Sequence, residues 1–132
     1  MEDLWKGRLE ASPYYFKVDM PFFRKELKDF LPDQIIDIHA HTVSPKALKP
    51  DAPPPDFWAE KVCPNGMDLP SLLESYKLMF PEKNIKPVIF TWPSKRFDLE
   101  KGNAYVSYQA KKFDLWSLIL TKPEWSVIAV SY

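Results

Sequence analysis

The sequence predicts an α/β fold in which parallel strands alternate with helices. Three observations carry this prediction: short apolar runs rich in β-branched residues, amphipathic segments of helical period between them, and prolines at the ends of both. Because alternating strands and helices imply parallel strands joined by right-handed crossovers, we expect a single sheet with helices packed along it.

The composition is that of one folded domain. The chain has 132 residues, of which 45% are hydrophobic and 27% charged, close to the averages of globular chains. Eighteen basic residues balance eighteen acidic ones, so the chain lacks the basic excess of a nucleic-acid-binding or membrane-surface protein. Its single cysteine, Cys63, permits no internal disulfide and is typical of a reducing compartment. With no secretory signal or long apolar run, we expect a cytoplasmic protein with no nucleic acid and no membrane as partner.

The first predicted helix covers residues 21–31. Its apolar residues share one face, Asp19 can serve as the N-cap, and Pro32 ends the helix. That face comprises Phe22, Phe23, Leu27, Phe30 and Leu31. Residues 1–18 are aromatic and irregular, and we interpret them as an N-terminal extension of a domain over 19–132.

The first predicted strand covers residues 34–38 and is a β-branched run followed by His39 and His41. Residues 43–66 then hold six prolines and show neither helical nor strand period, so we expect a long loop there. A loop of this length in a compact domain is usually functional or disordered. Its position directly after the two histidines favours a function.

The next unit is a helix over 69–80 with Asp68 as its cap, followed by a strand over 87–92. The helix carries an unbroken apolar stripe and is ended by Pro81. The strand is apolar at consecutive positions, which is typical of a sheet covered on both faces.

The last unit is open to two interpretations. A helix over 104–112, with Asn103 as its cap, is followed either by a strand over 116–120 or by more helix and a strand over 126–131. We prefer a helix that ends near Phe113. It places the second and third strands close to the roughly 30 residues of one βαβ unit.

His39 and His41 are the only histidines and the candidate functional residues. They are two residues apart at the end of a predicted strand, so both side chains should point the same way. Imidazole binds zinc, iron, nickel and copper, and ligand sites of parallel α/β folds form at these strand ends. We therefore predict a divalent metal site; the alternative is two polar residues at an ordinary strand end. Asp37 is expected on the opposite face, where it satisfies a backbone or helix group.

Residues 35–41, Ile-Ile-Asp-Ile-His-Ala-His, resemble the first barrel strand of the amidohydrolase superfamily: an apolar run, an aspartate, a small or apolar residue, and His-x-His. Residues 67–73 resemble the first barrel helix, 87–90 the second strand, and 103–106 the start of the following helix. The resemblance extends over about residues 19–126. It is nearest to the amidohydrolase-related group of hydrolases and decarboxylases.

This resemblance implies a (β/α)8 TIM barrel that holds one or two divalent ions, often zinc, with His39 and His41 as metal ligands. The ion would activate water for C–N or C–O hydrolysis, or polarise the substrate of a decarboxylase. The resemblance implies a small-molecule substrate if the rest of a barrel completes the chain. The family takes further histidines and a catalytic aspartate from later strands, whereas this chain has no third histidine. A full barrel needs roughly 250 residues.

We therefore expect an N-terminal fragment of such a hydrolase, about two and a half β/α units with three parallel strands. Alone it should be inactive, and it should tend to self-associate through its open sheet edge. The alternative is a non-enzymatic βα module, or a half-barrel that assembles with another chain.

Other loop residues could contribute to a site. Three carboxylates of the proline-rich loop are candidates for a third metal ligand: Asp51, Asp56 and Glu60. Trp92 could line a pocket, although core packing is our preferred interpretation. Lys95 and Arg96 could meet an acidic substrate, although we interpret them as a solvated loop pair.

Overall fold

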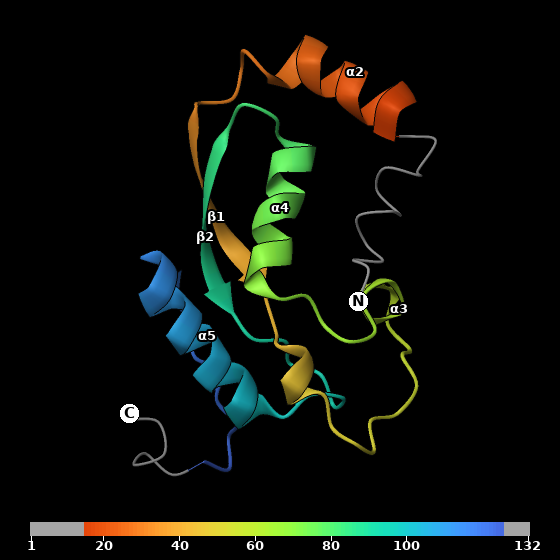
Figure 1. The fold of residues 1–132 in the computed structure, drawn as a ribbon, viewed down its shortest axis with the longest axis vertical. Coiled ribbons are helices and arrows are strands. Elements are labelled where there is room, and N and C mark those ends of the chain that lie inside the picture. Colours follow the sequence, from red (N-terminus) through yellow and green to blue (C-terminus); the bar gives the residue numbers. More distant parts are fainter. Residues whose placement is uncertain (1–14, 126–132) are drawn as a thin grey trace.

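The computed structural model describes residues 15–125 (Figure 1). Its elements in chain order are η1 (Tyr15–Asp19), α2 (Met20–Phe22), η2 (Phe23–Leu27), β1 (Gln34–His41), η3 (Pro45–Ala47), α3 (Trp58–Val62), α4 (Leu69–Met79), β2 (Asn84–Phe90), α5 (Leu99–Phe113) and β3 (Trp116–Ser117). Together they form a mixed α/β fold. Within the described residues the sheet is open, parallel and three-stranded, in the order β1-β2-β3.

The third strand lies where the preferred interpretation places it. Val88 pairs with Trp116, and the Leu118 amide donates to the carbonyl of Ile89 at 2.9 Å. Helix α5 ends at Phe113, so the continuous helix is excluded. The alternative strand over 126–131 lies outside the described residues.

Two predicted details of α5 are corrected. The helix begins at Leu99, and its cap is Asp98, whose side chain accepts from the Lys101 amide at 3.0 Å. Asn103, the predicted cap, is buried inside the helix. Its Nδ2 donates to the Leu120 carbonyl at 2.8 Å, and its Oδ1 accepts from the Leu120 amide at 3.2 Å. Asn103 therefore holds the segment after β3 against α5, and the strand ends at Ser117, three residues before its predicted end.

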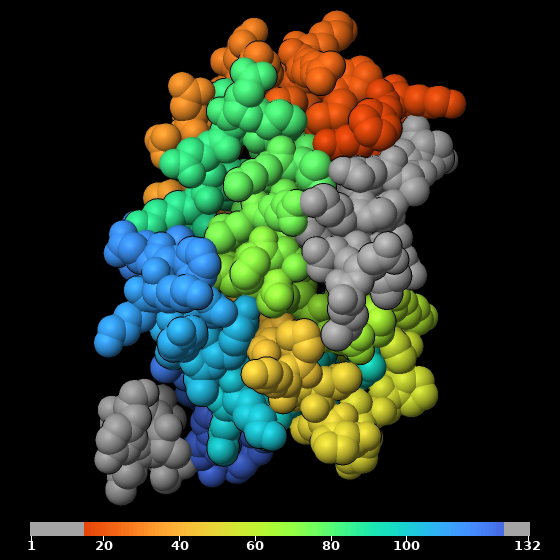
Figure 2. Space-filling model, in the orientation of Figure 1, coloured from red at the N-terminus to blue at the C-terminus, as the bar shows by residue number. Residues whose placement is uncertain are grey.

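Helices α4 and α5 cover the same face of the sheet. The core between them and the strands is formed by Ala40, Leu69, Leu72, Tyr76, Ile89, Val106 and Ala110. The predicted cap of α4 is confirmed, since the Asp68 carboxylate accepts from the Ser71 amide at 2.9 Å. In Figure 2, α4 lies between the N-terminal helical segment and α5. None of the helices in residues 15–125 combines the length and the apolar character that crossing a membrane requires.

The opposite face of the sheet carries exposed apolar side chains. Ile36 and Ile38 of β1 are 55% and 76% exposed, and Trp116 of β3 is 56% exposed. The prediction of a sheet covered on both faces is therefore wrong for residues 15–125. Exposed apolar surfaces of this kind often mark interaction or ligand-binding sites.

The N-terminal helical segment differs from its prediction. It already begins at Tyr15 within the described residues and contains π-type turns, in which the Lys28 amide donates five residues back to the Phe23 carbonyl at 2.8 Å. Asp19 has helical backbone angles and makes no capping bond, so the predicted cap is wrong. Of the predicted apolar face, Phe23 is buried and Leu27 and Leu31 are partly so; Phe22 and Phe30 are exposed.

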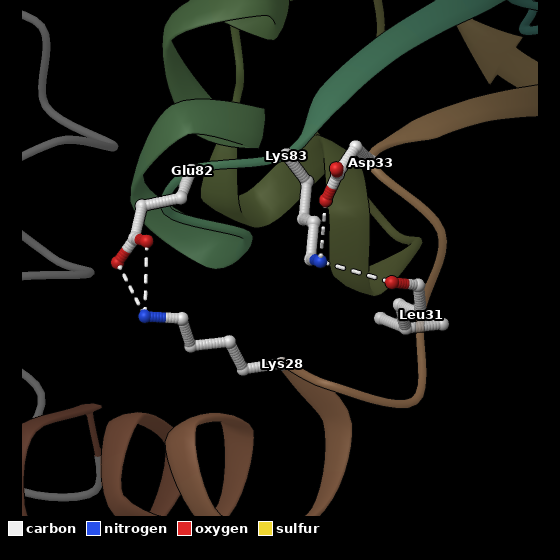
Figure 3. A network of polar contacts seen from close by, with 5 residues as sticks. All are labelled: Lys28, Leu31, Asp33, Glu82 and Lys83. Carbon is white, nitrogen blue, oxygen red and sulfur yellow. Dashed lines mark hydrogen bonds and ion pairs between the residues drawn. The ribbon is translucent and has the colours of Figure 1, made fainter.

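Two lysines fasten this segment to the turn between α4 and β2 (Figure 3). Lys28 Nζ contacts both carboxylate oxygens of Glu82, at 3.1 and 2.9 Å. The buried ammonium of Lys83 donates to the Leu31 carbonyl at 2.9 Å and to Asp33 at 3.1 Å. These contacts fix the chain just before β1 to the chain just before β2, where the two strands begin side by side.

The proline-rich loop contains two short helices, η3 and α3, so its expected lack of helix is corrected. Ser44 caps η3 by accepting from the Lys46 amide at 3.2 Å. The loop packs on the segment after β2: Val43, Ala47 and Phe97 form a buried cluster, and the Lys49 amide donates to the Arg96 carbonyl at 2.9 Å. The two segments that follow β1 and β2 therefore lie together at the carboxyl ends of the strands.

Candidate metal centre

His39 and His41 converge at the carboxyl end of β1. Their Nε2 atoms are 3.2 Å apart, and both rings lie on the side of the sheet that the described helices leave uncovered. The predicted same-side orientation is therefore confirmed. Two nitrogens bound at about 2.0–2.1 Å to one tetrahedral zinc ion lie roughly 3.3 Å apart, so the pair is spaced to share an ion.

A bulge in β1 sets this orientation. Asp37 pairs with Pro87 and Ala40 with Ile89, so β1 takes three steps where β2 takes two. The extra residue changes the phase of the strand. Asp37 and Ala40 therefore both face the helices, whereas His39 and His41 face the open side. Strict alternation would have placed Asp37 beside the histidines.

Asp37 stabilises the bulge from the helix side. Its Oδ1 accepts from the His39 amide at 2.9 Å, and its Oδ2 accepts from the Tyr76 hydroxyl of α4 at 2.5 Å. The expected structural role, bonding to a backbone or helix group, is confirmed on both counts. Burial, and then the bond to Asp37, raise the pKa of Tyr76 above its usual range, so the phenol remains a donor.

The ring of His41 is fixed in the tautomer that a metal needs. Its Nδ1 lies 3.0 Å from the Thr91 carbonyl, which can only accept, so Nδ1 carries the hydrogen and Nε2 presents its lone pair. Burial lowers the pKa of His41; the Thr91 bond acts against this shift and the neighbouring His39 adds to it. The Phe90 ring packs against both imidazoles, with centroid distances of 4.9 and 4.3 Å.

A pocket of about 470 Å³ opens beside His41. It is lined by the proline-rich loop, α3 and the segment after β2. Of the three loop carboxylates proposed as a third ligand, Asp56 and Glu60 line this pocket and Asp51 does not. Within residues 15–125 no three side chains of the metal-binding types come together around one point. The two histidines therefore fit a metal as a pair, without a third protein ligand from the described chain.

The segment after β2 holds a buried polar group that the sequence did not indicate. Arg96 is 8% exposed, whereas Lys95 is exposed, so the interpretation as a solvated pair is wrong for Arg96. Glu60, 4% exposed, accepts a short hydrogen bond from the Ser94 hydroxyl. Trp92 stacks on Phe97, with centroids 5.9 Å apart, and also lines the pocket. No local period distinguishes these residues in the sequence, because their burial depends on the loop that folds over them.

No protein-family model, curated protein or solved structure matches the chain.

Proposed function

We propose that His39 and His41 bind a divalent metal ion, zinc in the first instance, in a hydrolase or decarboxylase of the amidohydrolase type. The chain would supply the first β/α units of a (β/α)8 barrel. The observation that carries the proposal is the 3.2 Å separation of the two Nε2 atoms at the carboxyl end of β1. Active sites of such barrels lie at this end of the strands.

The arrangement of the sheet supports the same proposal. The strands follow one another in chain order, and α4 and α5 both pack on one face. In a doubly wound sheet each half also has its helices on one face, so this arrangement agrees with the first units of a barrel and does not distinguish the two folds. The uncovered face, with Ile36, Ile38 and Trp116, corresponds to the inside of a barrel, where further strands would bury it.

The chemistry follows from the ligand pair. A bound divalent ion lowers the pKa of a coordinated water or polarises a substrate oxygen. Burial favours the neutral form of His41, the Thr91 carbonyl aims its Nε2, and Asp37 fixes the backbone at His39. Catalytic zinc usually has three protein ligands, so a pair alone should hold the ion weakly. We therefore expect metal binding without turnover from this chain alone.

The uncovered apolar face favours a second candidate, a half-barrel that assembles with another chain and has no activity of its own. Ile38 and Trp116 would be buried in that assembly. Sedimentation of the purified chain tests this candidate: a stable oligomer that forms without metal and binds none would favour assembly over metal chemistry.

The metal proposal is tested by competition between the 132-residue chain and a chromogenic zinc chelator. His39→Ala and His41→Ala should each weaken zinc binding by about tenfold or more, equivalent to about 1.4 kcal/mol. Cys63→Ser is the matched control and should leave the affinity unchanged. Equal affinity in wild type and both histidine variants would refute the proposal. Metal-dependent turnover of ester, amide or carboxylic-acid substrates by a monomer, abolished by His39→Ala, would instead show that the chain is a complete enzyme.

A further inference from the structure

We propose that Arg96 binds a carboxylate group of the substrate in the pocket beside His41. The inference deepens the proposed function and rests on it for the reaction, since it assigns the substrate class of the same site. It starts from the placement of Arg96, which lines this pocket, and of its guanidinium group, whose Nε donates to the Pro53 carbonyl.

Among the described residues, the side chain of Arg96 is held in place by neutral hydrogen-bond partners. Its Nε donates to the Pro53 carbonyl at 2.9 Å, and its amide donates to the Ser94 hydroxyl at 3.1 Å. Its Nη1 is enclosed and has no hydrogen-bond partner in the described chain. No carboxylate of residues 15–125 forms an ion pair with it. A buried guanidinium nitrogen without a hydrogen-bond partner is costly, so an anionic ligand that bonds to the guanidinium would lower the free energy of this site.

The remaining pocket residues select the kind of anion. Asp56 and Glu60 oppose the positive charges of Lys95 and Arg96, so the lining does not favour a doubly charged phosphate ester. A carboxylate is an acceptor that forms strong charge-assisted hydrogen bonds with a guanidinium group. Apolar rings in the lining suit an organic body attached to that group: Phe57, Trp92 and the prolines Pro53, Pro54 and Pro93.

His41 lines the same pocket as Arg96, so a ligand bound by Arg96 lies near the proposed metal site. A carboxylate held by Arg96 serves as the binding group. The bond that reacts lies elsewhere in the substrate, toward the histidine pair. The substrate class that follows is an organic acid with its reactive amide, ester or second carboxyl group at the other end.

The test is a titration of the isotope-labelled 132-residue chain by nuclear magnetic resonance with three probes: benzoate, its neutral analogue benzamide, and inorganic phosphate. We expect benzoate to shift the Trp92 indole signal and the amide signals of residues 94–96, with benzamide and phosphate at least about tenfold weaker. Equal effects of benzoate and benzamide would overturn the proposal, because the pocket would then bind only the ring. No benzoate shifts at these positions would overturn it as well. This comparison needs only the wild-type chain.

Substitutions of Arg96 and Lys95 show which of the two cationic side chains binds benzoate. Arg96→Gln should weaken benzoate about tenfold or more, and Arg96→Lys, which keeps the charge but not the planar fork, should lose less. Lys95→Gln removes the same charge from the same pocket and should change the affinity less than about twofold. A larger loss in Lys95→Gln than in Arg96→Gln would overturn the assignment.

These experiments distinguish a failure of the metal-site proposal from a failure of the carboxylate-site proposal. His41→Ala should weaken zinc binding by about tenfold or more, whereas Arg96→Gln should not alter it. Benzoate binding through Arg96 in a chain that binds no zinc would refute the metal function alone. Zinc binding without benzoate binding would refute the carboxylate site alone.

Discussion

The Tyr76 hydroxyl of α4 lies 2.5 Å from the Asp37 carboxylate of β1 and donates to it. The other oxygen of that carboxylate accepts from the His39 amide at 2.9 Å. A helix is thereby coupled to the strand bulge that turns the histidines toward the open face. The coupling links the stability of the fold to the geometry of the candidate metal site.

Tyr76→Phe should destabilise the chain by about 1.5–3 kcal/mol, because it removes a hydrogen bond to a charged and partly buried carboxylate. Chemical denaturation with circular dichroism measures the loss. A double-mutant cycle with Asp37→Asn should show a coupling energy between the two positions. Additive losses would mean that the contact contributes little. Tyr108→Phe, at an exposed position of α5, is the control.

The pKa of His41 in the metal-free chain should lie below about 6.5, chiefly because the ring is partly buried. Since the unfolded chain then takes up the proton more readily, this residue contributes stability above pH 6.5 or so, and the contribution is lost as the pH falls through the folded pKa. Titration of the imidazole signals measures the value, and His39→Ala should raise it. A folded pKa at or above the usual value would contradict the burial described here.

Gly102→Ala should destabilise the chain by about 1–3 kcal/mol, the range for overpacking. The added Cβ would lie 2.1 Å from Thr91 Oγ1 and 3.0 Å from Thr91 Cβ. At an exposed position within a helix the same change would stabilise by about 1 kcal/mol, so the sign of the effect decides whether α5 approaches β2 this closely. Thermal unfolding measures it, and Thr91→Ala in the same chain should recover part of the loss.

Asn103→Ala should release the segment after β3. The substitution removes two hydrogen bonds to the Leu120 backbone and should cost about 1–3 kcal/mol. Amide hydrogen exchange gives the sharper measurement: the Leu120 amide should lose protection. The Leu118 amide, which donates to the Ile89 carbonyl, should keep most of its protection and serves as an internal control. Uniform loss at both amides would indicate general unfolding.

Short-range patterns predicted much of this fold. The apolar run ending in His39 and His41, the stripe of α4 and the Asp68 cap depend on neighbouring residues, and all three appear in the structure. The β1 bulge was not predictable, because it is stabilised by Tyr76, which lies far along the chain.

Distant contacts explain the other differences too. Asparagine is a common N-cap residue, yet the nearby Asp98 caps α5 and Asn103 bonds to Leu120. Arg96 was predicted to be solvated, because its neighbours in the sequence do not indicate the distant Pro53 carbonyl that accepts from its Nε. In each case a local preference was overridden by a partner that only the folded chain supplies.

The strand order has a consequence for how the sheet is made on the ribosome. Each strand pairs with the one synthesised just before it, so its partner already exists when it emerges. Val88 pairs with Trp116 across a shorter stretch of chain than separates Gln34 from Asn84, so the proline-rich loop makes the first pairing the slower closure. The rate of early folding should therefore depend on the same loop that covers the pocket beside His41.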